Sequence, residues 1–148
     1  MRSEVEPDTT VARRPFPSWS IRLPASFSHV FVHEGGYWHA WDKHRSVSLS
    51  SIELVDERGP VAADRIVDEL TAPQGSPLAA RPPGLPGWAV EDEAPQPAVA
   101  TRCLSGMLAV DGRMLIVTIA SDDREWTTRT WCSIRQHRTA PPRSRAVA

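Results

Sequence analysis

RCLSGMLAVDGRMLIVTIA, residues 102–120, is the clearest β-hairpin in this sequence. Its centre, Asp111-Gly112, is a dipeptide that favours the two-residue type I′ turn. If Val110 pairs with Arg113 across that turn, both faces of the second strand are largely apolar. A strand of this kind lies in the interior of a sheet that is covered on both faces. The hairpin therefore predicts a layered domain with this ribbon in the middle of its sheet.

Strands are also expected on the N-terminal side of this hairpin, where apolar and polar residues alternate with the period of a half-buried strand. One such segment is WSIRLP, residues 19–24. A second hairpin over residues 29–41 turns at Gly35-Gly36, and a further strand lies within residues 47–54. The serine-rich middle of that last strand predicts either an exposed face or a β-bulge.

Two segments have the pattern of helices. In residues 63–70 the apolar side chains recur at helical spacing, with Pro60 shortly before the segment and Pro73 beyond its end. Near the C-terminus, Asp122 is followed three residues later by Glu125, a variant of the capping box in which Asp122 is the N-cap. The β-branched threonines that follow leave a final strand as the alternative, but the cap favours a helix.

The chain of 148 residues is long enough for one domain with a core of its own. We predict a single α+β domain over residues 18–135, built from a mainly antiparallel β-sheet covered by two helices. Residues 72–97 are rich in proline and glycine and are predicted to form a long loop, within which Trp88 and Val90 form either a short strand or an anchor. Residues 1–17 and the basic segment 136–148 have little to bury and are predicted to be disordered tails.

Composition limits the classes of partner. The net charge is −1, so the protein as a whole has no strong field to capture nucleic acid or an anionic membrane. No apolar run approaches the roughly 20 residues that span a bilayer, and the N-terminus has no secretory signal pattern. We therefore expect a cytoplasmic protein whose two cysteines are reduced. The strong preference for arginine over lysine indicates a bacterium with a GC-rich genome.

Residues 29–41 contain most of the distinctive chemistry. A three-residue turn there pairs Phe31 with His39, and it places these two residues on one face with Tyr37 and Trp41. A two-residue Gly-Gly turn would instead move His39 to the other face. Only the first register gives a clean apolar face of valines, Trp38 and Ala40, so we prefer it. Phe31, Tyr37, His39 and Trp41 are our candidate residues for binding a partner or ligand.

A metal site is the alternative use of the same hairpin. His29, His33 and His39 share the aromatic face in the preferred register, and neutral imidazole is a common ligand of transition metals. Three imidazoles seldom converge from one flat hairpin, so we predict no metal and no other cofactor. His33-Glu34 is not a zinc-protease motif, because position 37 is tyrosine and two glycines would break the helix that the motif needs. No nucleophile elbow, phosphate-binding loop or dinucleotide motif is present, and no catalytic residue is predicted.

The two ends of the predicted domain resemble the PsbP-like α/β/α sandwich family. WSIRLP at residues 19–24 is similar to the "WSLxLP"-like opening strand of that family, and WCSI at residues 131–134 is similar to its closing helix. The order of elements between them is also similar. This family includes accessory and partner-binding proteins and has no shared catalytic motif, so the resemblance implies a PsbP-like sandwich and a binding role.

The expected function is therefore that of a non-enzymatic accessory or binding protein with a protein partner or a small ligand. Aromatic residues and arginine are enriched in protein interfaces, which fits the hairpin. A metal-dependent protein that uses the histidine cluster is the alternative, and a homo-oligomer that uses the aromatic face is a third.

Overall fold

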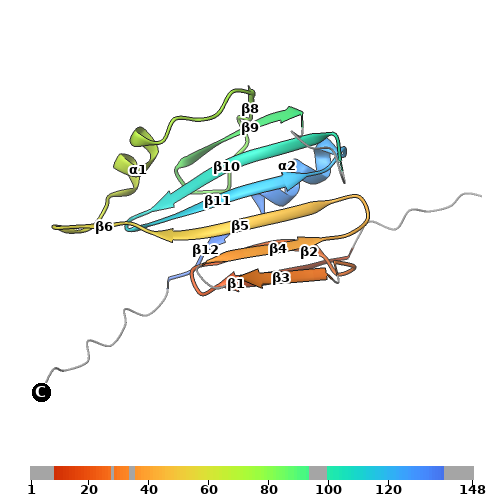
Figure 1. Ribbon diagram of the computed structural model, residues 1–148, viewed down its shortest axis with the longest axis horizontal. Coiled ribbons are helices and arrows are strands. Elements are labelled where there is room, and N and C mark those ends of the chain that lie inside the picture. Colours follow the sequence, from red (N-terminus) through yellow and green to blue (C-terminus); the bar gives the residue numbers. More distant parts are fainter. Residues whose placement is uncertain (1–8, 28, 34–35, 94–99, 139–148) are drawn as a thin grey trace, which may run out of the picture.

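The computed structural model describes residues 9–27, 29–33, 36–93 and 100–138, with the side chains of residues 29–31 and 33 outside the description. Within these residues the chain forms a large antiparallel sheet, a small antiparallel sheet, a two-stranded ribbon and two helices (Figure 1). This confirms a mainly antiparallel α+β fold.

The large sheet has seven strands, and all neighbouring strands are antiparallel. In their order across the sheet the strands are β3 (His29–His33), β4 (Tyr37–Trp41), β5 (Ser46–Glu53), β11 (Arg113–Ala120), β10 (Arg102–Val110), β9 (Gly87–Glu93) and β8 (Ser76–Pro77). The predicted central hairpin is β10–β11, and it pairs Val110 with Arg113 as expected. It lies inside the sheet, with β5 on one side and β9 on the other.

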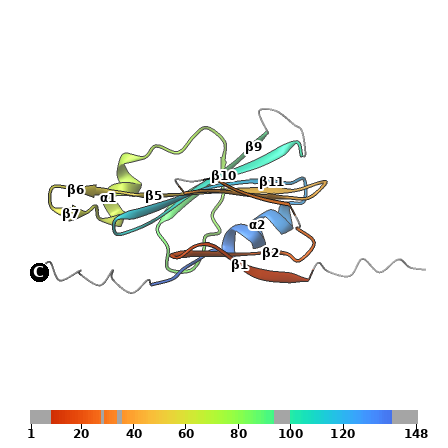
Figure 2. The same cartoon turned by 60° about the horizontal axis from the view of Figure 1, so that its bottom comes forward.

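The small sheet covers one face of the large one together with the C-terminal helix. Its strands, in order, are β1 (Thr10–Phe16), β2 (Trp19–Pro24) and β12 (Arg135–Gln136). The helix α2 (Arg124–Cys132) lies between the two sheets in the view of Figure 2. Large side chains from all three parts share one core, among them Trp19, Leu115 and Trp131.

Helix α1 (Ala63–Glu69) covers part of the opposite face of the large sheet. Its buried residue Ile66 packs with Met107 and Ala109, which alternate along β10 with the residues that face α2. A short ribbon of β6 (Val55–Asp56) and β7 (Gly59–Pro60) precedes the helix. The two predicted helices are therefore both present, and they lie on opposite faces of the sheet.

The predicted N-terminal tail is wrong for residues 10–16, which form strand β1. This segment has few large apolar residues, so composition alone indicates disorder. It is ordered because its backbone pairs with β2, from Thr10 with Pro24 to Phe16 with Trp19. Residues 1–8 of the predicted tail lie outside the described residues.

Two other predicted boundaries also change. The predicted loop 72–97 contains strand β8 and the seven-residue strand β9, so of the two roles expected for Trp88 and Val90 the strand is the one present. Residues 94–97 of the predicted loop lie outside the described residues. The predicted tail 136–148 begins inside β12, and its residues 139–148 lie outside the described residues. Of the two alternatives for the serine-rich middle of β5, the β-bulge is excluded, because β5 pairs with β11 in an unbroken register from Ser46 to Glu53.

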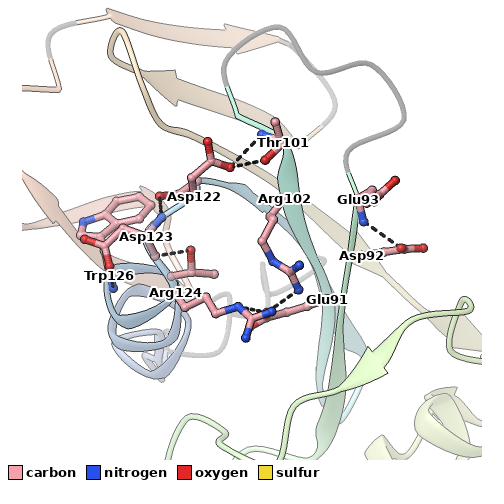
Figure 3. Close-up of polar contacts among 11 residues, drawn as sticks. Glu91, Asp92, Glu93, Thr101, Arg102, Asp122, Asp123, Arg124 and Trp126 are labelled. Atoms are coloured by element: carbon pink, nitrogen blue, oxygen red, sulfur yellow. Dashed lines mark hydrogen bonds and ion pairs between the residues drawn. The ribbon is translucent and has the colours of Figure 1, made fainter.

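The start of α2 differs from the prediction by one residue. Asp123 is the N-cap, and its side chain accepts a hydrogen bond from the backbone N–H of Trp126 (Figure 3). Asp122, the predicted cap, instead accepts hydrogen bonds from the backbone N–H and the hydroxyl of Thr101. It therefore ties the start of the helix segment to the start of β10. With Asp123 as the N-cap, the N3 residue is Trp126 instead of Glu125, so the predicted capping box does not form.

Candidate functional site

The β3–β4 hairpin has a three-residue turn, which is the register predicted from the clean apolar face. His33 pairs with Tyr37 and Phe31 pairs with His39, which excludes the two-residue Gly-Gly turn. Gly36 has a φ of 94°, a value that favours glycine over residues with a side chain. Glu34 and Gly35, the first two residues of the turn, lie outside the described residues.

Strand β4 divides its side chains between two environments, as the preferred register requires. Trp38 and Ala40 face the core and are 4% and 1% exposed. Tyr37 on the other face is 36% exposed, and His39 and Trp41 beside it are half-buried. The predicted separation of an apolar face from an aromatic face is therefore confirmed for β4.

The expectation that the valines of β3 point into the core is wrong for Val32. Its side chain is 65% exposed, although it pairs with the buried Trp38. β3 is the outermost strand of the sheet, so the covering layer that buries Trp38 does not extend over Val32. The side chains of Phe31, His29 and His33 lie outside the described residues, so their predicted roles remain predictions.

The aromatic residues of β4 belong to a larger surface, which we call the open face. It extends from β4 across β5 to β11, on the side of the sheet opposite α2. On this side the half-buried residues of β5 are serines, and those at the end of β11 are Thr118 and Ala120, while Val47, Leu49, Val117 and Ile119 between them are buried. Further along β11 the same side carries Met114 and Ile116, which pack against the cluster of α1 and bound the surface there. The members of the open face are Tyr37, His39, Trp41, Ser46, Ser48, Ser50, Thr118 and Ala120.

The three rings of the open face are stacked along β4. The Tyr37 and His39 ring centroids are 6.3 Å apart with planes at 10°, and those of His39 and Trp41 are 5.0 Å apart with planes at 28°. Because each ring faces its neighbour, the stack presents ring edges to a partner. This arrangement differs from a platform of separate rings on which successive nucleic-acid bases stack.

Ser48 joins two of these rings. Its Oγ lies 2.6 Å from Nδ1 of His39, and the Tyr37 hydroxyl donates to the same oxygen at 3.4 Å. Partial burial lowers the pKa of His39, which favours the neutral imidazole at pH 7. The serine side chain therefore holds the imidazole in place.

A tight turn between β4 and β5 fixes the end of the aromatic stack. Both backbone N–H groups of His44 and Arg45 donate to Asp42, at 2.9 and 2.8 Å, and the Arg45 guanidinium pairs with the same carboxylate at 2.7 Å. Burial would raise the pKa of Asp42, but the hydrogen bonds from Arg45 and His44 and the charge of Arg45 lower it below its ordinary value. The guanidinium also lies over the rings of Phe27 and Trp126, at 5.3 and 4.9 Å from their centroids.

The metal alternative gains no support from the described residues. Among them, no group of three or more histidine, cysteine, aspartate or glutamate residues is arranged to hold a metal ion. Two of the three predicted ligands, His29 and His33, have side chains outside the description. In addition, Nδ1 of His39 is engaged with Ser48. A histidine metal site thus remains a prediction.

A second polar cluster lies on the side of the large sheet that α2 covers, between β9, β10 and α2 (Figure 3). Glu91 contacts Arg102 at 3.4 Å and Arg124 at 3.9 Å, and it thereby links the sheet to the first turn of the helix. The hollow beside these residues measures only about 10 Å³, which leaves room for at most one water molecule. We interpret this cluster as a structural link, and no motif in the sequence indicates it.

A larger hollow of about 440 Å³ lies near the β10–β11 turn. Its lining includes Glu53 and Asp111 as well as Arg113 and Arg138, so neither sign of charge dominates. Asp111 accepts a hydrogen bond from the backbone N–H of Ala63, and Arg113 donates to Ser18. These charged side chains hold the turn, α1 and the small sheet together.

The sequence pattern indicates the aromatic residues of the open face but not Ser48, the serine that joins two of them. The alternation in SVSLSS, residues 46–51, indicated an exposed face on β5. The contact of Ser48 with the rings of β4 requires β4 and β5 to pair in the register that puts His39 opposite Ser48. That pairing is a property of the tertiary structure.

No protein-family model matches the chain, and no curated protein sequence matches it either. Within the described residues, neither helix has the length and apolar character needed to cross a membrane.

Proposed function

We propose that this chain is a non-enzymatic binding or accessory protein whose open face binds a partner protein. The observation that carries the proposal is the contrast between the two sides of β4, β5 and β11. One side is buried under α2 and the small sheet, while the other keeps three aromatic rings and a row of hydroxyl groups partly exposed.

The composition of the open face supports protein recognition. Tyrosine and tryptophan supply large contact areas with few rotatable bonds, and serine supplies hydrogen bonds that adapt to a partner. The rings of Tyr37, His39 and Trp41 are already ordered by stacking and by Ser48, so little side-chain entropy is lost on binding.

The shape of this surface favours a protein over a small ligand. Sites for small molecules are concave and enclose most of the ligand, whereas the open face is one side of a pleated sheet. Phe31 is included in the proposed surface by its register with His39. The proposal includes a PsbP-like sandwich, because that fold fits an accessory role. It also includes a bacterial source and a cytoplasmic location.

Photo-crosslinking tests the proposal because it captures a partner whose identity is unknown. The photoreactive residue p-benzoylphenylalanine replaces Tyr37 in one variant and Leu70, which is equally exposed at 36% but lies beyond α1, in a control. We expect a specific adduct in cells only for the variant at position 37, identified by mass spectrometry.

Competition then links the adduct to the open face. Excess wild-type protein should suppress the adduct, whereas the Tyr37→Ala, Trp41→Ala double variant should not. Equal adducts at positions 37 and 70, or equal competition by the double variant, would refute the proposal. An adduct with a second copy of the chain alone would favour the oligomer alternative over a partner protein.

A further inference from the structure

Among the strands that the structure describes, most sheet edges are protected against pairing with another strand. An edge strand presents unpaired N–H and C=O groups, and soluble proteins protect it with short length, proline or charge. Strand β8 has two residues and contains Pro77, and β12 also has two residues. Strand β1 is longer but carries Arg13, Arg14 and Pro15.

Strand β3 is the exception. It forms the edge of the seven-stranded sheet, and among the described strands it hydrogen-bonds only to β4 (Figure 1). Its five residues, HVFVH, include no proline, lysine, arginine or acidic residue. Its register with β4 is regular from His29 to His33, with no bulge to twist the edge away. Val32 on this strand is among the most exposed large apolar residues described, at 65%.

The sequence of β3 identifies the strand that would pair with it. HVFVH is a palindrome centred on Phe31. In an antiparallel pair of two such strands, Phe31 lies opposite Phe31 of the second copy and Val30 lies opposite Val32. Aromatic residues directly opposite one another in an antiparallel ladder stabilise the pairing of the two strands.

We propose that β3 is a dimerisation edge, through which two copies of this chain pair antiparallel about a two-fold axis at Phe31. The axis is perpendicular to the sheet, because directly opposed residues in an antiparallel ladder project to the same face. The two seven-stranded sheets then continue into one another. No other surface is needed for the pairing, so the proposal is independent of the proposed function.

The dimer has a consequence for the open face. A two-fold axis perpendicular to the sheet places both open faces on the same side, next to one another across the β3–β3 junction. A partner with two binding sites would then bind with an avidity of about 10²–10⁴ over a single site. This consequence, unlike the dimer itself, rests on the proposed function.

Pairing through one five-residue strand buries little area, so the dimer belongs to the small and weak class of interfaces. We expect a dissociation constant on the order of 10 µM. Sedimentation velocity of the full chain from about 1 to 500 µM should therefore show a shift from monomer to dimer.

Two valine substitutions locate the interface. Val32→Lys adds a charge to the exposed edge and should raise the dissociation constant at least tenfold. Val55→Lys is the matched control, because Val55 is 67% exposed on the ribbon before α1, and it should leave the dimer unchanged. A monomer at every concentration overturns the proposal, and so does a Val32→Lys variant that dimerises like the wild type.

A cysteine at the axis tests the register and does not depend on the lysine variant. Phe31→Cys places two thiols directly opposite one another, at the Cα separation of about 4.5–5.5 Å that a disulfide accepts. Mild oxidation should convert this variant, but not the wild type or Val55→Cys, into a covalent dimer. A reversible dimer with no crosslink at position 31 would overturn the palindromic pairing.

Discussion

Replacing Gly106 by alanine should destabilise the whole domain, because this glycine lets α2 approach the large sheet. Gly106 lies in β10 beneath the indole of Trp131, which is 0% exposed. A Cβ at position 106 would lie 2.6 Å from Cζ3 and 2.7 Å from Cη2 of that ring. Both distances are shorter than any van der Waals contact, so the ring or the strand must move.

The contacts of the Trp131 ring determine how much stability Gly106→Ala removes. The indole N–H of Trp131 donates to the carbonyl of Ala80 at 2.9 Å, which ties α2 to the proline-rich segment. Overpacking of a core typically costs about 1–3 kcal/mol, and a ring that tilts away also weakens this hydrogen bond, by about 1 kcal/mol. The lower entropy of the unfolded alanine chain offsets roughly 0.4–1 kcal/mol. We expect a net loss of about 2 kcal/mol, or roughly 6 °C in Tm for a chain of this size.

Urea and thermal unfolding, followed by circular dichroism, measure this loss directly. A double-mutant cycle with Trp131→Phe separates the ring contact from other effects, because phenylalanine removes part of the ring that opposes the new methyl group. In the Trp131→Phe background, Gly106→Ala should cost at least about 1 kcal/mol less than in the wild type. An unchanged Tm for Gly106→Ala, or a coupling energy of zero, would show that the indole does not lie on Gly106.

Two further predictions concern the ends of elements. Asp42→Asn keeps the acceptor for the turn but removes the charge opposite Arg45, so it should cost about 1 kcal/mol at pH 7, with the exposed Asp68→Asn as the neutral control. Folding lowers the pKa of Asp42 from 3.8, so the carboxylate contributes fully to stability above pH 3.8 and loses this contribution as the pH falls through its folded-state pKa. The difference in unfolding free energy between wild type and Asp42→Asn, measured by urea unfolding, should therefore shrink below pH 3.8. A difference that stays constant with pH would contradict the ion pair. Asp123→Ala should cost about 1 kcal/mol by removing the N-cap acceptor for Trp126, whereas Asp123→Asn should cost much less; equal losses in thermal unfolding would show that the cap is not the source.

The parts of the fold that follow from neighbouring residues were predictable. The Asp111-Gly112 turn and the alternation on either side of it predicted the central hairpin and its register. The clean apolar face of Trp38 and Ala40 selected the correct register of the second hairpin. Both depend on interactions between residues close in sequence, which local periodicity records.

Features that depend on distant residues were not predictable. Strand β1 looked like a tail because its order comes from pairing with β2 rather than from its own apolar residues. Val32 follows the buried pattern but is exposed, because burial depends on which layer covers the strand. Ser48 is one serine among several until β4 and β5 pair and bring it to His39.

The amino-acid sequence by itself therefore determined the two hairpins, the two helices and the aromatic composition of β4, since turn chemistry and side-chain periodicity are local properties. Only the tertiary structure decided which sheet face α2 and the small sheet cover, and which edge of the sheet is left unprotected. The physical reason is that burial and strand pairing are set by contacts between segments far apart in the chain. The open face and the β3 edge are both defined by what residues 9–27, 36–93 and 100–138 of the fold leave uncovered.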